Sequence, residues 1–237
     1  RAAAEELKHR PPLVARLHFE QAIHARPKDP AALRDLAAHH LLVKDVSSAR
    51  KSIERLLKLA DVAGQENSRH ILWARRTKAS LIGNSGRYAD YQQAVELLAE
   101  NNASPAWASA DLLLLSELTL PRGDPYALRD GIERFAAAAE ARDLSSAEQL
   151  ADGRLLARAG SWDACHEVMS QLVAASPDNV ALVTTWCEMQ LERGEAGNVE
   201  TLLRDLDEND PSVKRARARL FALTDRTDRA VELVRSL

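Results

Sequence analysis

The chain has 237 residues, of which 46% are hydrophobic and 28% are charged, as in an ordinary globular protein of one or two domains or one elongated array. A formal net charge of -3 argues against a nucleic-acid binder that relies on overall positive charge, and no apolar run approaches the roughly 20 residues that span a bilayer. The two cysteines provide no disulfide framework.

Sequence patterns typical of amphipathic helices dominate the chain. Residues Ala32 to Val43 and Ser47 to Leu59 carry apolar side chains at spacings of three and four, which predicts two amphipathic helices. Proline and glycine fall mostly between such segments. No segment of useful length alternates with period two, so we expect an all-α protein without strands.

A repeated pattern follows these helices along the whole chain. Each copy except a shorter last one has a small or apolar residue followed by apolar residues four and seven positions later and, in three copies, by a proline twelve positions later. Successive copies begin 34, 42, 40, 34, 34 and 31 residues apart. The copies are Ala15, Phe19, Ala22 and Pro27; Ala49, Ile53 and Leu56; Tyr91, Val95 and Leu98; Gly131, Phe135 and Ala138; Cys165, Met169, Leu172 and Pro177; Val199, Leu203, Leu206 and Pro211; and Ala230 and Val234.

This pattern resembles the tetratricopeptide repeat family, whose 34-residue unit combines W-x2-L-G-x2-Y, A-x3-F and a final proline. Gly153 matches the small residue of the first helix, Gly160 and Trp162 match the turn, and Gly86 and Tyr88 repeat this turn earlier. The resemblance implies an α-solenoid, a right-handed superhelix of antiparallel helix pairs stabilised by contacts between neighbours.

The expected repeats form a single solenoid, and each proline is expected to end the second helix of its repeat. The ranges are 1–27 (partial), 30–63, 69–103, 104–143, 146–177, 180–211 and 211–237 (partial). Extra residues near Ala63 to Arg69 and around Pro121 to Pro125 predict longer loops or helices there. The first and last residues suggest that the chain is a piece of a longer protein. The apolar last helix of the chain is expected to pack on further repeats or on a second copy.

The dipeptide Cys165-His166, with Asp163 upstream, raises the alternative of a nucleophilic enzyme. Adjacent helical residues point about 100° apart, and Cys165 and Cys187 occupy positions that suit a small buried hydrophobe. We therefore interpret both cysteines as packing residues and expect no enzymatic activity. A catalytic thiol would instead be abnormally reactive towards alkylation.

Other candidate sites have a structural interpretation. His39-His40 and the scattered histidines lack zinc-ligand spacing, so we expect neither a metal nor a cofactor. Arg122-Gly123-Asp124 is interpreted as a loop between helices, Asn102 as an unused glycosylation acceptor, and the carboxylates from Asp205 to Asp210 as solvated, because they lack the spacing of a calcium loop.

The resemblance also implies a binding surface, because the first helix of each repeat lines the concave face in this family. Groups on this face could bind carboxylates through charge-assisted hydrogen bonds, whereas the alternative is a solvated surface. The matching residues are Arg34, Trp73, Arg76, Arg154, Thr184, Arg215 and Arg219. The family's clamp for chaperone tails needs lysine and asparagine, and the corresponding positions Arg34, Ala38, Thr77 and Arg154 contain neither.

These observations predict a scaffold that binds a protein or peptide, with partners that carry acidic groups as one candidate class, and that neither binds nucleic acid nor inserts into a membrane. The alternative is a regulatory or ligand-sensing module that controls a fused effector domain and becomes more compact on binding. The composition, rich in alanine, arginine and leucine, favours a bacterial source. The compartment is left open, with the cytoplasm slightly favoured.

Overall fold

A computed structural model describes residues 12–60, 68–102 and 107–236, and this part of the chain is helical without strands, as predicted. None of its helices is both long and apolar enough to cross a membrane. Two compact units divide between Leu118 and Thr119. The helices are α2 (Pro12–Ala25), α3 (Pro30–Leu42), α4 (Val46–Leu57), α5 (Arg69–Gly83), α6 (Tyr88–Ala99), α7 (Ser109–Thr119), α8 (Pro125–Ala141), α9 (Ser146–Ala159), α10 (Trp162–Ala175), α11 (Val180–Glu192), α12 (Val199–Leu203), α13 (Pro211–Leu223) and α14 (Thr227–Arg235).

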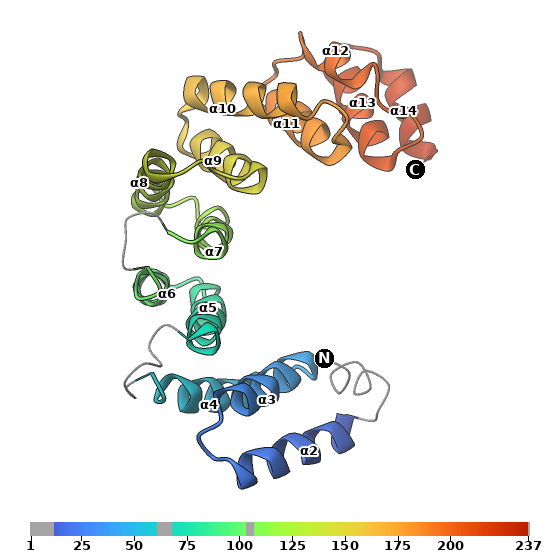
Figure 1. Ribbon diagram of the computed structural model, residues 1–237. Helices are drawn as coiled ribbons and strands as arrows, with labels where there is room; N and C mark the ends of the chain where they lie inside the picture. The colour runs from blue at the N-terminus through green and yellow to red at the C-terminus, as the bar shows by residue number, and fades with distance from the viewer. Residues whose placement is uncertain (1–11, 61–67, 103–106, 237) are drawn as a thin grey trace. The chain divides into compact units, whose positions relative to one another are not determined.

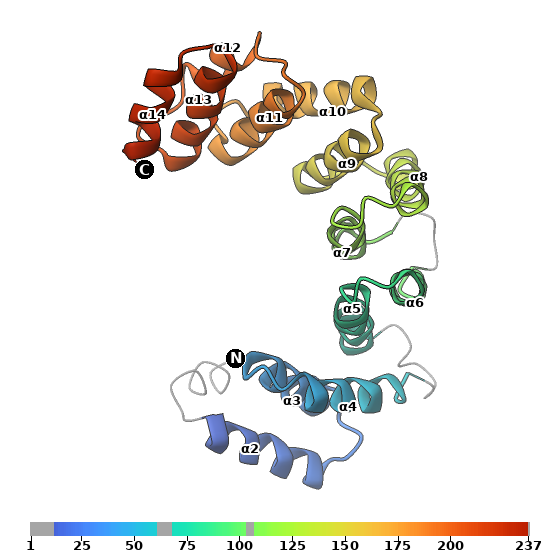
Figure 2. The same cartoon turned by 180° about the vertical axis from the view of Figure 1, so that it is seen from behind.

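The N-terminal unit consists of helix pairs. Helices α3 and α4 lie side by side, as do α5 and α6 (Figures 1 and 2). α2 packs on α3, and α4 packs on α5. The two helices predicted at residues 32–43 and 47–59 are confirmed as α3 and α4. Leu33 of α3 and Ile53 of α4 share one core with Ile71 and Ala74 of α5, so each pair depends on its neighbour for burial.

The C-terminal unit repeats this arrangement. α9 packs on α8 and α10, α11 packs on α13, and α13 packs on α14. Cys165, Met169, Trp186 and Val213 belong to one continuous core. The 17-residue helix α8 follows a short turn, so the extra residues of this repeat lengthen a helix. The division into repeats at the predicted ranges stays a prediction.

The repeated positions are buried in the central copies. Ala49, Ile53 and Leu56 are at most 1% exposed, and Gly131, Phe135, Ala138, Cys165, Met169 and Leu172 are also buried. Gly153 permits the close approach of two helices, because a Cβ atom there would lie 2.7 Å from Sδ of Met169. The predicted packing role of these positions is confirmed. At the two ends, Ala22 and Val234 are exposed instead.

The prolines correct one detail of the predicted repeat. Pro177 follows the end of α10, as expected, but Pro211 is the first residue of α13, and α12 already ends at Leu203. Proline suits the first turn of a helix because its missing N–H has no partner there. Asp210 completes this start by accepting hydrogen bonds from the backbone N–H groups of Ser212 and Val213.

A buried ion pair holds the start of α9. Ser145 and Glu148 form a capping box, in which each side chain accepts the backbone N–H of the other residue. Glu148 is 1% exposed and also accepts hydrogen bonds from both terminal nitrogens of Arg142, which follows α8. The Arg142 guanidinium is the main reason why the pKa of Glu148 is lowered to about 2. The junction between α8 and α9 therefore depends on an ionised carboxylate.

Candidate functional site

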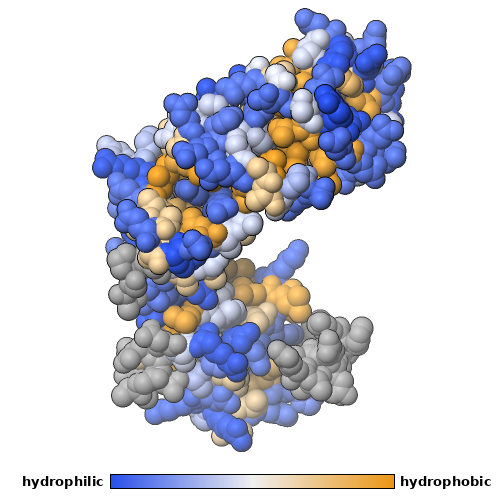
Figure 3. Space-filling view, turned by 45° about the horizontal axis from the view of Figure 1, so that its top comes forward, coloured by the Kyte–Doolittle hydropathy of each residue, from blue (hydrophilic) through white to orange (hydrophobic). Residues whose placement is uncertain are grey.

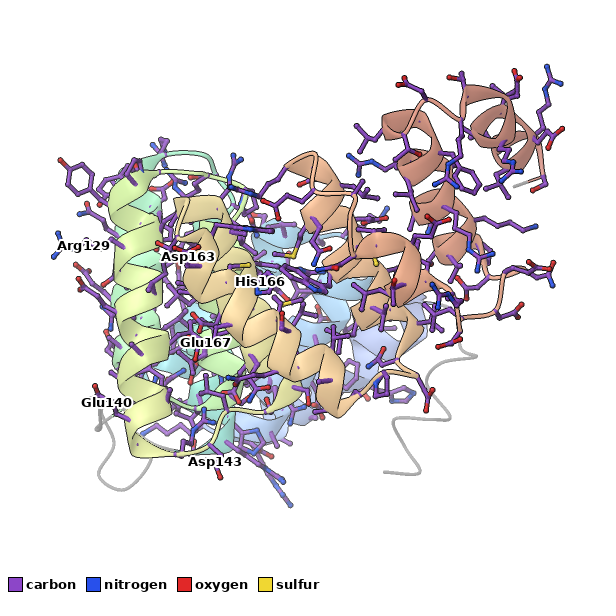
Figure 4. All side chains as sticks on the ribbon, turned by 90° about the horizontal axis from the view of Figure 1, so that it is seen from above. Arg129, Glu140, Asp143, Asp163, His166 and Glu167 are labelled. Atoms are coloured by element: carbon purple, nitrogen blue, oxygen red, sulfur yellow. The ribbon has the colours of Figure 1, made fainter. Side chains whose placement is uncertain are left out.

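Cys165 lies in α10 and is fully buried, as predicted for a packing residue. Burial raises the pKa of Cys165 to about 11, so its thiolate is disfavoured at neutral pH. Asp163 and His166 come from the same helix (Figure 4) but are exposed, and the His166 ring meets Trp186 edge-on. Burial also raises the pKa of Cys187 to about 12. The predicted packing role of both cysteines is confirmed.

The other short motifs act in local structure. Asp124, the last residue of Arg122-Gly123-Asp124, caps α8 by accepting the backbone N–H groups of Tyr126 and Ala127 at 2.9 and 3.0 Å. In the described ranges, no group of three histidine, cysteine or acidic side chains is arranged to hold a metal ion. On the outer surface of α8, Arg129 points away from the helix (Figure 4) and pairs with Glu133.

The structure brings together two of the predicted anchors in the N-terminal unit. The Arg34 guanidinium lies 5.7 Å from the ring centroid of Trp73, so the first helices of two successive pairs meet through a cation–π contact. Both side chains are partly exposed. This contact leaves an accessible arginine–tryptophan pair on α3 and α5, and partner binding by this pair stays a prediction.

Arg76 has a structural role that the sequence did not reveal. Its Nε and Nη2 atoms donate to the two carboxylate oxygens of Asp111 at 2.7 and 2.8 Å, and Asp111 is fully buried. Asn101 and Asn102 also donate to this carboxylate, at 3.0 and 3.4 Å. The hydrogen bond with Asp111 raises the pKa of Arg76. The Arg76 guanidinium is therefore occupied inside the protein, and the amide of Asn102, the predicted unused glycan acceptor, is engaged as well.

Thr184 is buried and does not lie on an accessible surface. Its hydroxyl donates to the carbonyl oxygen of Val180 at 2.7 Å, within its own helix α11. The family pattern led us to expect it on the binding face, but a β-branched residue at this position fits the core and satisfies its hydroxyl locally.

Arg215 and Arg219 line a groove of about 770 Å³ formed by α11, α13 and α14. Both arginines are exposed, and Arg219 lies 3.7 Å from Glu192. Val231 and Val234 of α14 are 42% and 60% exposed in this groove. Such apolar surface among hydrophilic residues is visible in the space-filling view (Figure 3). Self-association through this face stays a prediction.

Arg154 lines a second, smaller pocket together with residues that were not among the predicted binding residues. The pocket has a volume of about 320 Å³ and lies between α9, the start of α10 and α11. Arg158 and Arg193 add two further positive charges to it. The spacing of Arg154 and Arg158, four residues apart, is the signal that would have identified the pair, since such residues share one helix face.

Comparison with known proteins agrees with this architecture. The sequence matches no family model and none of the curated proteins. Among solved structures, it is similar to a tetratricopeptide repeat protein from Parabacteroides merdae ATCC 43184, with a TM-score of 0.66 and 13% sequence identity over 94% of this chain and 84% of that chain. The chain therefore has the fold of this tetratricopeptide repeat protein, an all-α solenoid.

Proposed function

We propose that the chain is a scaffold that binds a segment of a partner protein in the groove formed by α11, α13 and α14. The observation that carries this proposal is the pairing of exposed apolar side chains with arginines in one groove. The apolar residues that line it include Ala218, Ala222, Val231 and Val234. Interaction sites typically combine such an apolar centre with a polar rim.

The charges of the groove indicate the chemistry of the partner. Arg215, Arg219 and Arg235 line it together with one acidic residue, Glu188, so a segment with carboxylates beside apolar residues fits best. The ion pair between Arg219 and Glu192 is exposed, with a nitrogen–oxygen distance of 3.7 Å. Replacing Glu192 by a partner carboxylate in this pair therefore costs little free energy. Complete burial of an exposed valine contributes about 1.5–3 kcal/mol. Val231 and Val234 are 42% and 60% exposed, so each gains roughly half of this amount when a partner covers it, which is enough for both to act as anchors.

Photo-crosslinking tests this proposal directly. A photoreactive phenylalanine derivative replaces Ala222 in the groove or, as a control, the exposed Ala164 on α10. We expect partner peptides with acidic residues to attach at position 222 and not at position 164.

A matched pair of valine variants shows whether the groove is responsible. Val231→Glu should remove the crosslinks, whereas Val46→Glu, at a valine 41% exposed on α4, should retain them. Equal labelling at positions 222 and 164, or equal effects of the two valine variants, would contradict the proposal.

A further inference from the structure

The pocket between α9 and α11 has an unusual charge balance. Three arginines and one glutamate line it, together with apolar and aromatic residues. The lining residues are Leu120, Arg154, Ala157, Arg158, Trp162, Met189, Glu192 and Arg193. A small pocket with an excess of positive charge predicts an anionic ligand group.

Two of these arginines, both on α9, have exposed side chains. Arg154 and Arg158 lie one turn apart on α9, are exposed, and form no ion pair within the part of the chain that the structure describes. Like charges at this spacing slightly destabilise a helix. The one acidic residue of the pocket, Glu192, lies 3.7 Å from Arg219 outside it. The charge on α9 is therefore available to a ligand.

The opposite wall of the pocket is held in place by aromatic stacking. The guanidinium of Arg193 lies 4.5 Å from the ring centroid of Trp162, and Trp162 stacks on Trp186 with ring centroids 5.4 Å apart. Trp186 is 2% exposed, so this stack is anchored in the core. Glu195 accepts hydrogen bonds from Trp162 and Arg193. A positive group fixed in this way loses little side-chain entropy when it binds a ligand.

The turn before α8 accommodates Arg158. Gly123 has a positive φ of 62°, and a Cβ atom on it would lie 2.7 Å from Nη2 of Arg158. A larger residue would therefore displace the guanidinium. The Arg158 guanidinium therefore lies against this turn, whose end is fixed by Asp124 as the cap of α8.

We propose that this pocket binds side-chain carboxylates of an acidic peptide segment. The planar guanidinium of arginine matches a carboxylate in a two-hydrogen-bond arrangement. Arg154 and Arg158 present two guanidinium groups to the pocket, and Arg193, which also pairs with Glu195 at 3.0 Å, adds a third beside the apolar lining residues. The inference rests on the proposed role in binding a protein segment, but it assigns a second site on different residues. It also names the group that this site recognises.

The test uses the whole chain and labelled octapeptides in a fluorescence anisotropy titration. One peptide alternates glutamate with alanine, and its control has glutamine in place of glutamate. Each peptide is made with a free and with an amidated C-terminus. We expect only the glutamate peptides to bind, equally well in both terminal forms, and to bind more weakly at high salt. Preference for the free terminus, regardless of glutamate or glutamine, would overturn the assignment to side-chain carboxylates.

Two matched double variants locate the binding site. Arg154→Gln with Arg158→Gln should weaken binding about 10- to 100-fold. Lys51→Gln with Arg55→Gln removes two charges at the same spacing from the exposed surface of α4 and should change it less than about 2-fold. All four residues are exposed, so both variants should fold, with circular dichroism as the check.

The outcomes separate this inference from the proposed function. Equal losses in the two double variants, or no binding of any peptide, would overturn the inference. If crosslinking in the groove still depends on Val231 in that case, the scaffold proposal stands without the second site. Conversely, glutamate-dependent binding that requires Arg154 and Arg158 supports the inference even if Val231→Glu leaves crosslinking unchanged.

Discussion

Replacement of Arg76 by methionine tests whether this residue stabilises the fold or binds a partner. The substitution keeps much of the aliphatic side chain but leaves the Asp111 carboxylate, which is 0% exposed, without its cation. Removing one partner of a buried ion pair costs about 3–5 kcal/mol. Asn101 and Asn102 still donate to this carboxylate, so we expect a loss near the lower end of this range.

The control is Arg129→Met on α8. Arg129 also forms an ion pair through its Nε atom, at 2.8 Å from Glu133, but both side chains are largely exposed, by 80% and 62%. An exposed pair four residues apart on a helix contributes far less to stability than a buried pair does. The two arginine variants should therefore differ by several-fold in their effect on the free energy of unfolding, although their ion pairs have similar lengths.

Urea-induced unfolding followed by circular dichroism measures this difference, and hydrogen exchange locates it. The loss of protection in Arg76→Met should concentrate on α5 and α7. Adding Asp111→Leu to Arg76→Met should recover part of the stability, since the uncompensated charge is then gone. Equal destabilisation by the two arginine variants would refute the reasoning. So would a stable Arg76→Met protein that loses partner binding, because Arg76 would then be a binding residue.

Three further predictions concern the C-terminal unit. Glu148→Gln should lower the free energy of unfolding by about 3 kcal/mol at neutral pH, because the pKa of Glu148 falls from 4.5 to about 2 on folding. Urea unfolding should show that this loss of stability persists above pH 5 and shrinks towards pH 2. A loss that does not depend on pH would contradict the prediction. Gly153→Ala should cost about 1–3 kcal/mol through its clash with the Met169 side chain, whereas Gly197→Ala, with no atom within 4 Å of the added Cβ, should change the melting temperature little. Cys165 and Cys187 should react slowly with iodoacetamide in the folded protein and rapidly after unfolding, as mass spectrometry can show; fast labelling of either folded thiol would contradict their burial.

The repeated pattern predicted the architecture because burial of a helix face leaves a periodic trace in the sequence. Ile53, Phe135 and Met169 occupy equivalent positions and are all buried. The early end of α12 at Leu203 left no such trace, since the apolar spacing continues to Leu206. The segment that follows, between Asp207 and the start of α13, is shaped by local hydrogen bonds of Asp207 and Asp210 with nearby backbone N–H groups.

The binding residues were harder to predict because the sequence does not show which group a charged side chain contacts in the folded protein. Arg76 and Arg154 occupy the same class of position, yet one is bound to a carboxylate 35 residues away and the other is exposed in a pocket. Asp111 lies in a mostly apolar helix, and a charge buried there requires hydrogen-bonding partners. This acidic residue was therefore the sign in the sequence that a basic side chain would be bound inside the protein. The residues that supply those partners depend on the folded arrangement and not on spacing.

The convergence of four donor groups on Asp111 has a consequence for attempts to exchange or reorder the helical modules. Apolar interfaces tolerate substitution by surfaces of similar size, but these hydrogen bonds have direction and demand specific donors. An interchange that separated Arg76 from residues 101–111 would bring an unmatched carboxylate into the new junction. Segment 76–111 should therefore be transferred whole, and recombination boundaries belong outside it.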